Sequence, residues 1–496
     1  MDLGGSLDGT GVLWLRSRVT RWHPGAGGGA TGNRTPAGQA GDVGSGGDVV
    51  PFGAATWAWF LISLQTFGGP AGQIAVMQRE LVEERRWIGQ ERFLHALSYC
   101  TLLPGPEAQQ LAIYVGWLLN GIRGGLVAGV LFVLPGLVAL MGLSAVYVVF
   151  GDTTAVVAVF SGLAPAVLAV VAQALVRVGK RALGHPALVA LAVAAFVALA
   201  VFSTPFPVVV AVSAGIGWVL GRWAPGTMRR PTGRGDGQHG PAPLISDDAL
   251  HHAPPSRTHA WKVIGIGLVA WGVPVGVVVA FTGAHSIFSD QAFFFSGAAL
   301  VTFGGAYAVL AYVAQKAVEV YGWLAPGEMV RGLALAETTP GPLIMVVVFV
   351  GFLGAYRDPG ALNPWVAAVL AALLVTWVTF VPSFTLVFLG APYVERLRDN
   401  RALSAALSGV TAAVVGVIAN LAVFFAVHTL FADVHVATTG PFHLQVPELA
   451  SLKPVSAAIA VVAAVLLFRV KWSVLRTLAT CAILGLAAGL LGLTVT

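Results

Sequence analysis

The sequence has little charge and almost no cysteine. Charged residues make up 10% of its 496 residues, whereas a soluble globular protein carries about 25%. The two cysteines, Cys100 and Cys481, both lie in apolar stretches and provide neither a disulfide framework nor the spacing of a metal site. A phosphate-binding loop, a dinucleotide fingerprint and a Cys/His cluster are also missing from the sequence. We therefore predict a non-enzyme without cofactor or metal, and an ATP-driven pump only if a partner chain supplies the motor.

Hydrophobic residues, in contrast, make up 57% of the chain, and the mean hydropathy is +0.82. A helix that spans a bilayer needs about 20 apolar residues. The net charge of +6 comes from basic residues in short loops between apolar runs, which is typical of membrane topology and does not indicate a nucleic-acid partner. We predict an all-α, multi-pass membrane protein, with the lipid bilayer as a partner. The long apolar runs are residues 125–150, 153–176, 264–281, 364–389, 404–430 and 474–493.

The sequence also repeats itself. Thr66-Phe67-Gly68-Gly69 recurs 236 residues later as Thr302-Phe303-Gly304-Gly305, and Pro104-Gly105-Pro106 recurs at the same distance as Pro340-Gly341-Pro342. Pro135 and Pro382 match at a distance of 247 residues, so we expect an insertion near residues 357–363. A long repeat in an apolar chain is typical of a transporter built from two related halves.

The repeat and the polar stretches together predict the domains. Residues 1–50 are rich in glycine, and we interpret them as a disordered tail, with an extension upstream of the true start as an alternative. Residues 51–222 form the first transporter repeat. Residues 223–260 form a polar cytoplasmic linker, and residues 261–496 form a linking helix and the second repeat.

The loop charges predict that the two copies are inverted in the membrane. Residues 79–92 contain four arginines, whereas their counterparts, residues 315–328, contain only Lys316. Residues 177–181 contain three basic side chains, whereas their counterparts contain none before Lys453. The loop at Asp152 has no basic residue, but its counterpart contains Arg396, Arg398 and Arg401. Since Lys and Arg stay on the cytoplasmic side, we expect an inverted-topology repeat.

Each copy is interrupted by two glycine and proline breaks. They predict re-entrant helical hairpins, with a break inside one discontinuous spanning helix as the alternative at Gly68-Gly69-Pro70. Pro-Gly-Pro ends one half-helix and starts another, and the freed backbone is tolerated only beside protein or water. The N-terminus of the second half-helix offers free N–H groups and a positive dipole end to an anion.

A single break is often structural, but four breaks in two matched pairs favour a transport site. We predict that the substrate contacts Thr66, Gly68, Gly69, Gln73, Pro104, Gly105, Pro106, Glu107, Gln109, Gln110, Thr302, Gly304, Gly305, Tyr307, Thr338, Thr339, Pro340, Gly341 and Pro342.

Four charged residues near the breaks are candidates for a role in transport. Glu107 and Glu337 are candidates for proton coupling, because an intramembrane carboxylate is a functional hypothesis by default. Glu107 is alternatively a helix cap at the positive end of the dipole. Arg85 and Arg86 are candidates for anion entry, and the alternative is an ordinary basic flank of the membrane segment.

At these motifs the chain resembles the chromate ion transporter family, in the long form that fuses both halves. The resemblance extends over residues 52–493 and is carried by residues 67–75, 80–97, 102–111, 116–118, 302–307 and 338–342. It implies a secondary transporter of the bacterial plasma membrane that exports chromate, gives chromate resistance, and is driven by the membrane potential, by proton antiport or by both.

The alternatives are a carrier of sulfate or another oxyanion, and an anion channel. The assembly also stays open, with a homodimer as one alternative. Leu343 stands where the second copy would have the counterpart of Glu107, so we expect the two half-sites to be chemically unequal.

Overall fold

The structure is a computed structural model that describes residues 49–67, 69–223, 244–245, 257–303, 306–391, 401–439 and 442–493. Most of the predicted tail and of the predicted linker lies outside these residues. So do Gly68, Gly304, Gly305, Arg396 and Arg398.

The described chain is helical, and long apolar helices dominate it. Among the described residues, six helices are long and apolar enough to cross a membrane. This confirms the prediction of an all-α polytopic membrane protein. Almost every residue of α9 (Arg257–Thr282) is at least partly exposed, as expected of a helix in lipid. The other five are α5 (Glu107–Phe150), α6 (Thr154–Ala182), α8 (Phe206–Trp223), α14 (Pro364–Gly390) and α16 (Arg401–Leu430).

Shorter helices occur where the sequence predicts broken segments. They are α2 (Phe52–Gln65), α3 (Gly69–Gln78) and α4 (Gln90–Cys100) in the first copy, and α10 (Ile287–Val301), α11 (Ala306–Gln315), α12 (Pro326–Thr338), η4 (Leu343–Met345) and α13 (Val346–Arg357) in the second. At equivalent positions α3 and α11 continue into π-helical turns, η1 (Arg79–Glu84) and η3 (Lys316–Val320). The helices α7 (Pro186–Ala200), α17 (Pro454–Phe468) and α18 (Val474–Leu490) complete the fold. The same order of elements therefore occurs twice, with α9 between the copies.

Several helix starts follow directly from local sequence chemistry. The Asn363 side chain accepts a hydrogen bond from the Trp365 amide at the start of α14, and Pro364 occupies the first helical position. Ser286 caps α10 in the same way. Pro106 precedes α5 in extended conformation, so the Pro-Gly-Pro break ends where the new helix begins.

The Pro-Gly-Pro segment of the second copy lies in a hairpin that returns to the end from which it started. In the second copy, Arg357 at the end of α13 forms two hydrogen bonds of 2.7 and 2.6 Å with Glu328 at the start of α12. In the first copy, α5 leaves helical geometry at Asn120 and Gly121 and folds back on itself, so that Gly116 packs against Gly124. The half-helices between break and turn are shorter than the roughly 20 residues that a crossing needs.

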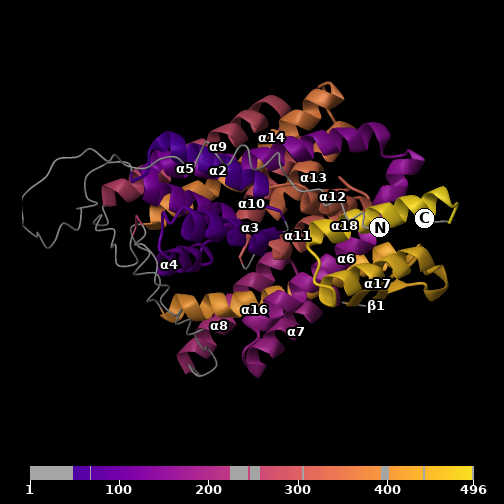
Figure 1. The fold of residues 1–496 in the computed structure, drawn as a ribbon. Helices are drawn as coiled ribbons and strands as arrows, with labels where there is room; N and C mark the ends of the chain where they lie inside the picture. The colour runs from indigo at the N-terminus through magenta and orange to yellow at the C-terminus, as the bar shows by residue number, and fades with distance from the viewer. Residues whose placement is uncertain are drawn as a thin grey trace, which may run out of the picture. The chain divides into compact units, whose positions relative to one another are not determined.

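The two copies are interleaved through their last helices (Figure 1). In the first copy α6 packs along α18 of the second, and α16 of the second copy packs along α8 of the first. Both contacts depend on glycine pairs, Gly162 with Gly485 and Gly409 with Gly217, where an added side chain would overlap the opposite backbone. Such reciprocal contacts are the property of a two-fold arrangement.

The equivalent helices α6 and α16 run antiparallel. Ser161 near the start of α6 and His428 near the end of α16 line the same cavity. Towards the other end of α6, Gly179 lies beside Val415 of α16, where an added methyl group would be 3.7 Å from the valine side chain.

One small β-hairpin stands outside the helical pattern and was not expected from the sequence. Strands β1 (Val434–Thr439) and β2 (Phe442–Pro447) pair antiparallel, with Val434 opposite Pro447. The hairpin connects α16 to α17 at the end of α6 that carries Ser161.

Candidate anion site at the helix breaks

The Pro-Gly-Pro break of each copy is held by the first broken helix of the other copy. The Gly105 amide donates to the Thr302 carbonyl over 2.7 Å, and the Gly341 amide donates to the Thr66 carbonyl over 2.9 Å. Thr66 and Thr302 are equivalent positions at the C-caps of α2 and α10. The structure thus brings the predicted breaks together in one reciprocal lock at the contact of the two copies.

Both locking glycines have backbone conformations that other residues rarely adopt. The φ angles are +123° at Gly105 and +108° at Gly341, and glycine populates this region without steric cost. A methyl group added at Gly105 would lie 2.8 Å from the Ser383 hydroxyl of α14. Gly136, the counterpart of Ser383 in α5, lies beside the Pro340 carbonyl.

The side chains of the first glycine break also cross between the copies. The Gln73 side-chain amide donates to the Gly341 carbonyl. Gly69 faces the Tyr307 hydroxyl, which would be 3.6 Å from an added methyl group. The lock therefore includes described residues within or beside all four predicted breaks.

Glu337 is a buried carboxylate beside the lock. It is 1% exposed, and the Tyr307 hydroxyl donates to its Oε1 atom over 2.7 Å. Its Oε2 atom is buried without a hydrogen-bond partner among the described residues. Such a group indicates an unmet interaction, because buried polar atoms are normally paired.

Glu107 is the first residue of α5 and is partly buried. It interacts electrostatically with Arg181 at the end of α6, and Glu337 interacts with Arg177 one turn earlier. We call Arg177 and Arg181 the arginine end of α6. In the sequence these two residues indicate only the topology, because their link to both carboxylates depends on how α6 packs.

The glutamines after the first break have different environments. The Gln110 side chain donates to the Pro104 carbonyl over 2.7 Å, which satisfies a backbone group that the break has freed. Gln109 is fully buried, and neither its Nε2 nor its Oε1 has a partner among the described residues. Gln109 is therefore the amide with the most unused capacity to bind a ligand.

The predicted threonines use their hydroxyl protons within their own helices. Thr66 donates to Ser63, Thr302 to Ala298, Thr338 to Leu335 and Thr339 to Ala336, each to a backbone carbonyl. In this arrangement they close the ends of half-helices, while the free amides of the first turn of α5 remain as donors.

Arg85 and Arg86 lie apart from these contacts. Arg85 pairs with Glu80 at 3.5 Å and lies over the Trp87 ring. Arg86 is exposed, and its carbonyl accepts from the Leu244 amide of the linker. These contacts fit the alternative interpretation, a basic flank of the membrane segment.

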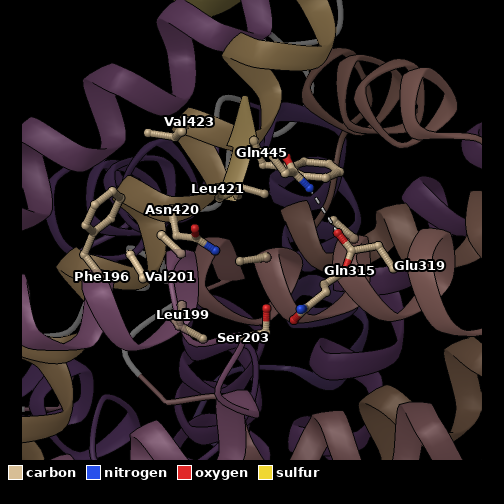
Figure 2. Close-up of a pocket in the computed structure, with 14 residues that line it drawn as sticks. Phe196, Leu199, Val201, Ser203, Gln315, Glu319, Asn420, Leu421, Val423 and Gln445 are labelled. Atoms are coloured by element: carbon tan, nitrogen blue, oxygen red, sulfur yellow. Dashed lines mark hydrogen bonds between the residues drawn. The ribbon is translucent and has the colours of Figure 1, made fainter. Parts of the chain in front are cut away.

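One cavity in the described part of the chain does not suit an anion (Figure 2). It has a volume of about 340 Å³ and is lined by residues of α7, α11, α16, η3 and β2. Figure 2 shows the Gln445 amide reaching Glu319, to which it donates over 3.3 Å. Glu319 is the charged residue of this lining, and a carboxylate repels an anion. Within the described ranges, no three His, Cys, Asp or Glu side chains gather to hold a metal ion.

Comparison with known proteins identifies the family. The family profile described as "Chromate transporter" matches residues 54–218 and 290–491. The chain belongs to the chromate transporter family. The matched segments of this chromate transporter family member include every break residue named above and the arginine end of α6.

Relatives agree with this assignment over most of their length. The chromate transport protein of Pseudomonas aeruginosa is 30% identical over 72% of this chain and 76% of its own. That of Cupriavidus metallidurans is 28% identical over 73% and 79%. The probable chromate transport protein of Synechococcus elongatus is 27% identical over 72% and 80%. No solved structure matches the chain. With its apolar helices and bacterial relatives, the chain is a multi-pass protein of the bacterial plasma membrane.

Proposed function

We propose that this protein is a secondary transporter that exports chromate from the cell and thereby gives chromate resistance. The observation that carries the proposal is the reciprocal lock of the helix breaks. In it the Gly105 amide donates to the Thr302 carbonyl, and the Gly341 amide donates to the Thr66 carbonyl. Family membership supports chromate as the substrate. Sulfate is the close tetrahedral analogue, so it is expected to compete.

The arrangement of the copies supports inverted-topology repeats. Equivalent helices α6 and α16 run antiparallel, and α9 adds one crossing between the copies. Transporters of this architecture place their substrate where broken helices of the two repeats meet. Alternating access then follows if one copy rocks against the other around the lock, which the glycine contacts allow without side chains in the way.

The chemistry at the breaks suits a tetrahedral dianion. Free amides in the first turn of α5 and the buried Gln109 amide offer N–H donors, and the positive end of the helix dipole adds attraction. The arginine end of α6 attracts anions towards the same region. Buried anions need such donors, because a charge without partners is costly in an apolar interior.

The membrane potential favours export of this substrate. Moving one charge across 100 mV corresponds to about 2.3 kcal/mol, so a dianion that leaves a negative cytoplasm gains roughly twice that amount. Proton antiport adds a further driving force. Import of the same dianion would have to overcome the electrical term.

Glu107 and Glu337 are the proposed coupling groups. Each stands in only one copy, since Leu343 occupies the position equivalent to Glu107 and Thr101 the position equivalent to Glu337. Glu107 interacts electrostatically with Arg181, and Glu337 with Arg177. An anion that binds between a carboxylate and its arginine would favour protonation of that carboxylate. The two half-sites would then work unequally within one transport cycle.

The test is uptake of radiolabelled chromate by everted membrane vesicles, whose cytoplasmic face is outside. We expect saturable uptake that rises when the lumen is made positive, and inhibition by excess sulfate. Glu107→Gln and Gln110→Ala should reduce the initial rate at unchanged protein level.

Three results would contradict the proposal. Uptake equal to that of vesicles lacking the protein would exclude chromate export. Conductance that never saturates and ignores pH would instead indicate an anion channel. Stronger uptake of sulfate, which chromate cannot displace, would assign the chain to another oxyanion.

A further inference from the structure

A second, smaller cavity lies at the other end of α6 from the arginine end. Its volume is about 130 Å³, and its lining includes Arg331 of α12 and Lys453 before α17 but no Asp or Glu. A water molecule needs about 10–15 Å³ of such space, so the cavity has room for a four-oxygen anion with part of its hydration. We call it the mouth cavity. It differs from the larger cavity, whose charged residue is Glu319.

The two cations of the mouth cavity are not neutralised by direct ion pairs. Arg331 donates to the Tyr147 hydroxyl over 2.9 Å, which is an uncharged partner. The nearby Glu328 is already held by two hydrogen bonds from Arg357. Among the described residues, the ion pairs within 4 Å include neither Arg331 nor Lys453.

The position of Lys453 disfavours the charged form of its ammonium group. Burial lowers the pKa of its ammonium group, and Arg331 lowers this pKa further, while Asp433 acts in the opposite direction. An anion between Lys453 and Arg331 would relieve this repulsion.

Helix ends and hydroxyl groups complete the lining. The first turns of α12 and α17 border the cavity, so the positive dipole ends of two helices face it, beside the C-terminal end of α16. Ser161 and Ser456 contribute hydroxyl groups. The hydroxyl of Thr429 is buried and has no hydrogen-bond partner among the described residues, which leaves a donor for a ligand.

The basic character recurs at the equivalent positions of the first copy. His95 stands 236 residues before Arg331, and Arg181 stands 247 before His428. His185 occupies the N-cap position of α7, as Lys453 does that of α17, 268 residues later. Basic groups at these positions therefore belong to both copies, and in the first copy one of them, Arg181, interacts with Glu107.

We propose that the mouth cavity is a second binding site for a tetrahedral oxyanion, formed by Arg331, Lys453 and Thr429. The proposal rests on the proposed function in one respect: in an exporter oriented by its loop charges, this site lies on the release side. Ser161 and Arg177 are 16 residues apart on α6, which is about 24 Å along the helix. The mouth cavity and the site at the breaks are therefore two separate sites along the proposed transport pathway.

The test is equilibrium binding of radiolabelled sulfate to the full chain in lipid nanodiscs. We expect two sulfate sites per wild-type chain and one in the double variant Arg331→Gln, Lys453→Gln. The charge-preserving variant Arg331→Lys, Lys453→Arg should keep both. Loss of each cation alone should weaken the second site about ten-fold, as expected for a hydrogen bond to a charged group. Thr429→Val, which conserves shape, should weaken it a few-fold.

The outcomes separate this site from the breaks and from lipid. Two unchanged sites in the double Gln variant would overturn the proposal, whereas no sulfate binding to any variant, or to wild type, would overturn it together with the proposed function. If the wild type binds one sulfate per chain and the double Gln variant binds none, the mouth cavity is supported and binding at the breaks is refuted. Two sites in phosphatidylcholine but one in discs with phosphatidylglycerol would support the cavity's oxyanion chemistry, with the lipid phosphate as its source.

Discussion

The reciprocal lock makes an unequal prediction for its two glycines. Gly105→Ala should destabilise the protein more than Gly341→Ala, although both residues have positive φ. Holding alanine in such a conformation costs about 1–3 kcal/mol at either site. At Gly105 the added methyl group would also lie 2.7 Å from Gln110 Nε2 and 2.8 Å from Ser383 Oγ, whereas at Gly341 the nearest atom is 3.4 Å away.

The size of the difference follows from the contacts that must move. Displacing the Gln110 amide breaks its bond to the Pro104 carbonyl, a net loss of about 0.5–1.5 kcal/mol. Ser383 must shift as well. We therefore expect Gly105→Ala to cost about 1–2 kcal/mol more than Gly341→Ala.

The assay is reversible unfolding of the purified protein in an SDS titration, followed by tryptophan fluorescence. Gly142→Ala is the matched control, because Gly142 lies inside α5 with nothing within 4 Å of an added methyl group. In that setting alanine should stabilise the helix by about 0.5–1 kcal/mol. A loss at Gly341 as large as that at Gly105 would refute the reasoning from close contacts.

Three further predictions concern single side chains. Tyr307→Phe removes the hydrogen bond from the Tyr307 hydroxyl to Glu337 and should reduce proton-dependent chromate uptake more than potential-driven uptake, as measured in vesicles with each gradient alone. Glu328→Gln should lower the free energy of unfolding by about 1–2 kcal/mol, because it weakens a two-bond ion pair that is partly screened on the Arg357 side; no loss in an SDS titration would exclude a structural role for the pair. Gln109→Leu should preserve stability, because neither amide atom has a partner to lose, yet slow chromate uptake; unchanged uptake would remove Gln109 from the site.

The general architecture could be predicted from sequence because it depends on local patterns. Apolar runs of bilayer length mark α5, α6, α9, α14, α16 and α18, and glycine and proline mark the points where half-helices end. The residues that flank each break can therefore be predicted from the positions of glycine and proline and from the 236-residue repeat.

Contacts between distant segments could not be predicted in the same way. The lock pairs Gly105 with Thr302, and nothing in the sequence near Gly105 encodes that partner. Ser383 lies at the break because α14 packs against it, although its match with Gly136, next to the matched prolines, was a visible signal. The arginine end of α6 looked like a topology signal, since its approach to Glu107 and Glu337 depends on tertiary packing.

The direction of chromate movement is the most direct test of the central claim. The initial rate of radiolabelled chromate uptake should be compared in everted vesicles with a positive lumen and in right-side-out vesicles with a negative lumen, at equal protein content. Potential-driven export through the lock predicts accumulation in the everted vesicles, abolition of that accumulation when the potential is collapsed, and exclusion from the right-side-out vesicles. Accumulation in the right-side-out vesicles against their potential would contradict export.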